Sequence, residues 1–118
     1  MDDIALKEVG KIRTLRGLMI QSTSITDEGI KQILDLPELD FLRIGDNRLT
    51  DASLKRIAMS LPKLTTLYLH RLDGVTDEGL LALGNHPKLQ YVHISRGQFS
   101  SAAIEKLRAV REGLRVIE

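Results

Sequence analysis

The chain has 118 residues, of which 42% are hydrophobic and 28% are charged, and its formal net charge is +1. This length and composition indicate one domain with a continuous core, while the interleaving of Lys and Arg with Asp and Glu excludes the basic stripe of a nucleic-acid-binding domain. The lack of cysteine excludes disulfides, zinc–thiolate sites and a cysteine nucleophile. No apolar run approaches the roughly 18–20 residues of a membrane span, and the acidic start lacks the features of a signal peptide. We therefore expect a cytoplasmic protein without a nucleic-acid or membrane partner.

A period of 24 or 25 residues runs through the chain and is marked by Leu15, Leu39, Leu64, Leu89 and Leu114. Such a period is typical of one supersecondary unit stacked on copies of itself. We predict a single repeat domain over residues 1–118. It comprises a half repeat with a helix (1–14), four full repeats (15–38, 39–63, 64–88 and 89–113) and a terminal strand (114–118).

The chain begins inside a repeat. Alignment backward from Leu15 places Asp2 and Asp3 on Thr26 and Asp27, so a helix without its own preceding strand is expected there. Stacked repeats usually need terminal caps with a polar outer face, and neither end has an obvious one. We therefore expect one open end to self-associate or to pack on a neighbouring domain.

Each full repeat opens with a strand pattern. In 39–63, Leu42 and Ile44 alternate with Arg43, as is typical of a strand with one buried face. A short loop follows and leads to an apolar residue that we assign to the core. The residues at this position are Ile25, Leu49, Val75 and Phe99.

A helix start follows each loop. A hydroxyl that can cap the helix recurs at one position, in Thr26, Thr50, Thr76 and Ser100. An aspartate follows in three repeats, and its negative charge interacts favourably with the positive end of the helix dipole: Asp27, Asp51 and Asp77. Two positions later a small residue predicts close approach to the preceding loop: Gly29, Ser53, Gly79 and Ala103. Prolines end three of the helices: Pro37, Pro62 and Pro87.

Strand, loop, helix and turn repeated in this order predict an α/β fold. A crossover between parallel strands is right-handed in nearly all proteins, so we expect a right-handed β-α solenoid. Its parallel sheet should line the concave face and its helices the convex face, because strands pack closer together than helices.

The phrases SITDEGI (24–30), LTDASL (49–54) and VTDEGL (75–80) resemble the leucine-rich repeat family, in its cysteine-containing subclass of F-box substrate receptors and bacterial repeat proteins. The resemblance covers essentially the whole chain and implies a horseshoe that recognises another protein on its concave sheet. Departures are also present: the subclass often has Cys or Asn at the strand-to-loop corner, where this chain has Thr23, Asn47, Leu72 and Gly97. An extra residue should make the loop 71–74 bulge. No F-box is present, so adaptor binding is not implied.

Residues between the core positions of each strand should face the concave surface in three lateral rows. The rows are Gly17, Phe41, Thr66, Tyr91 and Val116; Met19, Arg43, Tyr68, His93 and Glu118; and Gln21, Gly45, His70 and Ser95. Tyr and Arg are favoured at interface hot spots, which makes six residues the candidate partner contacts: Phe41, Arg43, Tyr68, His70, Tyr91 and His93. Alternatively, these aromatics are present because they suit strands.

We expect no enzyme activity, no cofactor and no metal. Ser95 beside His70 is the one hydroxyl–imidazole pair of interest, and no acid is evidently placed to orient it. A zinc site at His70 and His93 would need further ligands, and His86 before proline is interpreted as a turn residue. Two alternatives to partner recognition remain: a structural segment that stacks through its ends, and the specificity domain of a larger protein such as a ubiquitin-ligase receptor.

Overall fold

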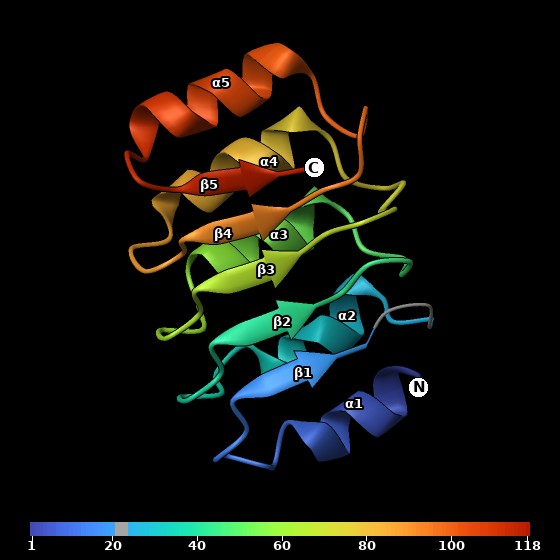
Figure 1. Cartoon of the computed structure of the whole chain (residues 1–118). Coiled ribbons are helices and arrows are strands. Elements are labelled where there is room, and N and C mark those ends of the chain that lie inside the picture. Colours follow the sequence, from blue (N-terminus) through green and yellow to red (C-terminus); the bar gives the residue numbers. More distant parts are fainter. Residues whose placement is uncertain (21–23) are drawn as a thin grey trace.

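The computed structural model describes residues 1–20 and 24–118, which form five α-helices and one five-stranded parallel sheet (Figure 1). The helices are α1 (Asp3–Val9), α2 (Asp27–Ile30), α3 (Asp51–Ala58), α4 (Asp77–Ala82) and α5 (Ser101–Val110). The strands are β1 (Gly17–Met19), β2 (Phe41–Arg43), β3 (Thr66–Tyr68), β4 (Tyr91–His93) and β5 (Arg115–Ile117). Short 3₁₀ turns extend two helices, namely η1 (Lys31–Ile33) after α2 and η2 (Leu83–Asn85) after α4.

The strands follow one another through the sheet in the order β1-β2-β3-β4-β5, and all neighbours are parallel. Each strand is connected to the next through a helix on the same side of the sheet (Figure 1). The prediction of an α/β fold with a parallel sheet is therefore confirmed, and the arrangement is compatible with stacked β-α units.

The register of β5 differs from the prediction. The alignment places Val116 opposite Tyr91, whereas the structure pairs Arg115 with Tyr91 and Ile117 with His93. The earlier repeats have one residue between their leading leucine and the first paired residue, but Arg115 follows Leu114 directly. This shift buries both Leu114 and Val116, which alternate with Arg115 as the period of two requires.

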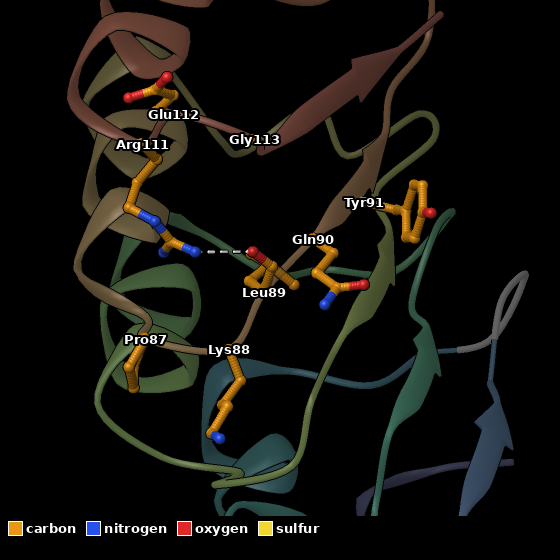
Figure 2. Close-up of a pocket in the computed structure, with 8 residues that line it drawn as sticks. All are labelled: Pro87, Lys88, Leu89, Gln90, Tyr91, Arg111, Glu112 and Gly113. Atoms are coloured by element: carbon orange, nitrogen blue, oxygen red, sulfur yellow. Dashed lines mark hydrogen bonds between the residues drawn. The ribbon is translucent and has the colours of Figure 1, made fainter.

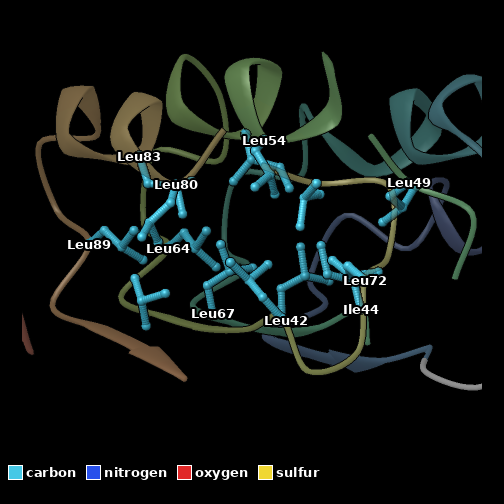
Figure 3. Packing of buried hydrophobic residues seen from close by; sticks show 14 of the residues in the cluster. Leu42, Ile44, Leu49, Leu54, Leu64, Leu67, Leu72, Leu80, Leu83 and Leu89 are labelled. Atoms are coloured by element: carbon cyan, nitrogen blue, oxygen red, sulfur yellow. The ribbon is translucent and has the colours of Figure 1, made fainter. Parts of the chain in front are cut away.

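The core lies between the sheet and the helices and is built mainly from leucine and isoleucine (Figure 3). Leu42 and Leu67 enter it from the strands, and Leu54 and Leu80 enter it from the helices, all with no exposed area. Ile25, Leu49, Val75 and Phe99 are also buried, as predicted. Burial of one such side chain contributes about 1.5–3 kcal/mol, and the buried residues of all repeats form one continuous cluster.

All four predicted residues occupy N-cap positions, and three of them make the predicted cap bond. The hydroxyls of Thr50, Thr76 and Ser100 accept hydrogen bonds from backbone N–H groups in the first turns of their helices, whereas Thr26 makes no side-chain cap bond. Capping side chains satisfy backbone donors that have no partner within the helix.

The aspartates at the first position of α1, α2, α3 and α4 join successive repeats. Each carboxylate accepts two bonds from the capping residue of the next repeat, one from its backbone N–H at 2.7–3.0 Å and one from its hydroxyl at 2.5–2.7 Å. We call these contacts the aspartate ladder; its pairs are Asp3–Thr26, Asp27–Thr50, Asp51–Thr76 and Asp77–Ser100. Sequence reasoning foresaw the dipole interaction and missed the ladder.

The small residues of the helices face this ladder. A Cβ atom on Gly29 would lie 1.9 Å from Asp3 Oδ1, and one on Gly79 would lie 2.2 Å from Asp51 Oδ1. Ser53, at the same position, donates its hydroxyl to Asp27 Oδ1 at 2.5 Å. The prediction of close approach was right, but the neighbour is the aspartate of the preceding helix and not the preceding loop.

The strand-to-loop corners differ from repeat to repeat. The buried Asn47 donates to the carbonyls of Ile20, Ile44 and Gly45 and accepts from the N–H of Ile25. In the fourth repeat Gln98 spans Leu69 O and Ser95 N–H in a similar way. Leu72 is buried instead, Gly97 has a φ of 77°, and Thr23 lies outside the described residues. The loop 71–74 begins at Arg71 with a φ of 54° and ends in a bridge between Gly74 and Thr50.

In the part of the chain that the structure describes, no helix has the length and apolar character needed to cross a bilayer.

Candidate functional site

The face of the sheet turned away from the helices carries the predicted contact residues. We call it the outer sheet face and define it as Gly17, Met19, Phe41, Arg43, Thr66, Tyr68, Tyr91, His93, Arg115 and Ile117. Strand pairing places Phe41 between Gly17 and Thr66, and Arg43 between Met19 and Tyr68. The first two predicted rows are therefore confirmed from β1 to β4, and only their last members change, from Val116 and Glu118 to Arg115 and Ile117.

The third predicted row follows the ends of the strands. Gly45 lies so close to the backbone of His70 that a Cβ atom on this glycine would be 2.5 Å from the His70 carbonyl oxygen. His70 and Ser95 are both partly buried. Gln21, the first member of this row, lies outside the described residues.

Five of the six predicted residues meet around one ring, that of Tyr68. His93 stacks on it with ring centroids 3.9 Å apart and an interplanar angle of 2°. Phe41 and His70 are tilted against it, with centroids at 5.3 Å and 5.8 Å, and the guanidinium carbon of Arg43 lies 5.0 Å from the ring centre. We call these five residues the Tyr68 cluster. The sixth residue, Tyr91, lies opposite Thr66.

Positive charge dominates the outer sheet face, because its charged side chains are Arg43 and Arg115 and it contains no Asp or Glu. Arg43 has no ion-pair partner among the described residues, and its Nε is buried without a hydrogen-bond acceptor. By contrast, Arg71 at the edge of the face pairs with Asp46 at 2.6 Å. Neither arginine of this face is ion-paired among the described residues, and Arg43 differs from the exposed Arg115 in that its Nε is buried without an acceptor.

The two histidines of the cluster favour their neutral forms. Partial burial lowers the pKa of His70, and the positive charges of Arg43 and Arg71 lower it further, against a smaller opposing effect of Asp46. Partial burial likewise lowers the pKa of His93, with further contributions from His70 and Arg43. Both imidazoles are therefore mainly neutral at pH 7, and the face gains positive charge on acidification.

A hollow of about 330 Å³ lies beside the outer sheet face, between the turns that lead into β4 and β5 (Figure 2). Its lining residues are Pro87, Lys88, Leu89, Gln90, Tyr91, Arg111, Glu112 and Gly113. Arg111 donates to the Leu89 carbonyl at 2.8 Å and also to the His86 carbonyl, so its guanidinium holds the two turns together. Sequence reasoning missed this hollow because it lies between turns, where no periodic pattern marks it.

The residues considered for catalysis and metal binding do not form such a site among the described residues. The hydroxyl oxygen of Ser95 accepts a hydrogen bond from the N–H of Arg71 at 3.1 Å. Within residues 1–20 and 24–118, no group of three or more His, Cys, Asp or Glu side chains is arranged to hold a metal ion.

His86 is more than a turn residue, because it is completely buried. Its Nε2 lies 3.1 Å from Ser60 O and 2.9 Å from Leu61 O, and its Nδ1 accepts from the N–H groups of Lys88 and Leu89. This pattern requires the neutral tautomer with the proton on Nε2. Leu36 and Leu61, which also precede prolines, are buried as well. The apolar residue at this position in two other repeats was the sequence signal that His86 is buried.

No protein-family model matches the chain, and a search of curated proteins finds no similar sequence.

Proposed function

We propose that the chain is a right-handed solenoid of leucine-rich-repeat-like units that binds another protein on its outer sheet face without catalysing a reaction. In this proposal the sheet lines the concave side. The observation that carries it is the Tyr68 cluster, which gathers two aromatic rings, two imidazoles and a guanidinium on a sheet face that no helix covers. Tyr and Arg are enriched in the centres of protein interfaces, where they are desolvated at modest entropic cost.

The geometry favours recognition over catalysis. The strands present side chains in fixed lateral rows about 4.8 Å apart, which suits a partner that makes many contacts across several repeats. An open sheet excludes water poorly, whereas catalysis benefits from an enclosed site with a positioned base. We therefore assign the cluster a binding role.

The test is capture of partners by the immobilised chain, compared with two alanine variants. Tyr68→Ala removes the centre of the cluster, and Met59→Ala removes an 80% exposed apolar side chain at the end of α3, on the helix side of the molecule. We expect a captured protein to bind wild type and Met59→Ala and to be lost with Tyr68→Ala. Circular dichroism must confirm that both variants are folded. Equal capture by a folded Tyr68→Ala variant would contradict the proposal.

A second candidate function is assembly through the N-terminal end of the stack. Met1 and Ile12 are 51% and 50% exposed, although Ile25 and Leu36, at the same positions one repeat later, are completely buried. Ile4 on α1 is 79% exposed. At the other end, Leu114 and Val116 are 5% and 6% exposed. Val110 on α5 is 62% exposed and Ile117 on β5 is 38% exposed, so the N-terminal end exposes more large apolar side chains than the C-terminal end, but both ends expose some.

Sedimentation equilibrium distinguishes this candidate from the first. If α1 packs on a second copy, the molar mass of the wild type should rise with concentration, and Ile4→Glu should keep the chain monomeric. The matched control is Met59→Glu, which places the same charge at an equally exposed apolar position. A wild type that is monomeric at millimolar concentration would eliminate assembly through this end.

A further inference from the structure

We propose that the segment bound at the outer sheet face is an acidic part of a protein, with a partner carboxylate seated beside Arg43; this inference rests on the proposed function. It names the chemistry of the partner, which the shape of the face alone leaves open. Three features support it, namely the unmatched charge of Arg43, the position of its guanidinium against the Tyr68 ring and the two neighbouring histidines.

The first feature is the missing counter-ion. Arg43 is partly buried and its Nε has no acceptor, whereas buried polar groups in native structures nearly always have a partner. The nearest acidic residue after β2, Asp46, is paired with Arg71. Nε itself is buried, so an incoming carboxylate would bind the terminal N–H groups of the partly exposed guanidinium, and it would do so without breaking an ion pair among the described residues.

The second feature is geometric. The guanidinium carbon of Arg43 lies 5.0 Å from the centre of the Tyr68 ring. A guanidinium is planar and its N–H groups lie in that plane, so it can contact a ring through its face and still bind a carboxylate through its edge. Phe41 and Tyr68 provide apolar surface for the carbon chain of the same acidic residue.

The third feature is the pair of histidines. His93 faces Tyr68, His70 and Arg43, with the apolar Ile117 opposite it on β5. His70 faces Arg43, Arg71 and Asp46, with Tyr68 beside it. Partial burial is the largest cause of both lowered pKa values, and the arginine charges lower them further; a bound carboxylate would offset the arginine charges and so would raise the pKa of both histidines. Binding is therefore coupled to proton uptake, and affinity should increase as pH falls from 7.5 to 6.

A protein carboxylate fits better than the phosphates of a nucleic acid. Nucleic-acid binding draws on several cations that track a backbone of phosphates. The outer sheet face has only Arg43 and Arg115, on β2 and β5, and the chain as a whole has a net charge of +1. Two isolated cations on a face rich in aromatic rings match the spaced acidic and apolar side chains of a polypeptide.

The test is a titration of the ¹⁵N-labelled chain, followed by NMR, with three probes of equal length: capped hexaglutamate, capped hexalysine and hexathymidylate. We expect hexaglutamate to shift the amide signals of β2, β3 and β4. Arg43→Gln should weaken its binding about tenfold, as for the loss of one charge-assisted hydrogen bond. The matched control is Arg56→Gln, which removes the same charge from an exposed site on α3 and should change the affinity less than about twofold.

The pH arm compares wild type with the variant His70→Gln/His93→Gln at pH 7.5 and pH 6. We expect hexaglutamate to bind wild type several-fold more tightly at pH 6, and the variant to bind equally at both values. Equal weakening by both arginine variants, or stronger shifts of the same amides with hexathymidylate, would overturn the inference. So would an unchanged wild-type affinity between the two pH values.

Failure of this inference can be separated from failure of the proposed function. If a captured protein depends on Tyr68 but tolerates Arg43→Gln, the outer sheet face binds a partner that is not acidic. If the captured protein also tolerates Tyr68→Ala, the face is not the binding surface.

Discussion

Replacement of Asp27 by alanine tests how strongly the aspartate ladder holds successive repeats together. The Asp27 carboxylate accepts bonds from Thr50 N–H at 2.9 Å, Thr50 Oγ1 at 2.5 Å and Ser53 Oγ at 2.5 Å. A hydrogen bond to a charged group contributes about 1.5–3 kcal/mol, and a buried hydroxyl that loses its acceptor costs about 1–3 kcal/mol. Asp27 is partly exposed and its bonds share one side chain, so the terms do not add fully. We expect Asp27→Ala to lower the free energy of unfolding by about 3 kcal/mol.

The chain contains a matched control for this substitution in Asp77. Its carboxylate accepts only the N–H and hydroxyl of Ser100, and Ala103 stands where the second repeat has Ser53. Asp77→Ala therefore leaves no buried hydroxyl without an acceptor, and its effect should be clearly smaller. In a Ser53→Ala background, the cost of Asp27→Ala should also fall, by about 1 kcal/mol.

Urea unfolding followed by circular dichroism measures these differences, provided that the slope against urea concentration is unchanged. The pH dependence gives a second readout. Partial burial alone would raise the pKa of Asp27, but hydrogen bonds from Ser53 and Thr50 outweigh it and lower the pKa below its ordinary value of 3.8. The stabilisation is therefore fully present above that value, and it is lost as pH falls through the lower folded-state pKa. Equal losses for the two aspartate variants, or a loss below about 1 kcal/mol for Asp27→Ala, would refute this account.

Three further predictions concern other parts of the molecule. Asn47→Ala should cost about 3 kcal/mol in urea unfolding, because four backbone groups lose a buried partner; a loss below about 1 kcal/mol would mean that these groups find other partners. Because the pKa values of His70 and His93 are lowered in the folded state, the unfolded chain binds more protons. The melting temperature should therefore fall between pH 7.5 and pH 5.5, and less so in His70→Gln/His93→Gln. Tyr91 is 38% exposed, so Tyr91→Ala should cost less than about 1 kcal/mol, and a loss of several kcal/mol would place this ring in the core.

Two periods in the sequence together predict most of the fold: the 24- or 25-residue repeat and the alternation of side chains along a strand. The spacing of the leucines sets which residues are lateral neighbours, and the period of two in a strand sets which of them face outward. This is why Phe41, Arg43, Tyr68 and His93 were placed correctly. The register of the last strand was predicted wrongly, because β5 begins directly after Leu114, whereas one residue separates the leading leucine from the strand in the earlier repeats.

Contacts between repeats were harder to predict than contacts within one. Rules for single helices assign Asp27 and Asp51 to the dipoles of their own helices, and they do not say how near the next helix lies. That distance depends on the packing of the whole stack. The burial of His86 escaped prediction for a similar reason, since its acceptors Ser60 and Leu61 belong to the preceding repeat.

The contacts that hold the repeats together leave the outer sheet face largely without a structural role. The aspartate ladder lies at the start of the helices, Asn47 and Gln98 lie at the corners after the strands, and His86 lies at the turn before β4. The strands themselves pair through backbone groups, which every side chain tolerates. Side chains on the outer face can therefore change with little effect on the fold. The Arg43 side chain contributes no hydrogen bond or ion pair to the fold among the described residues, and its buried Nε without an acceptor is the reason that the acidic-partner proposal is tested first at this residue.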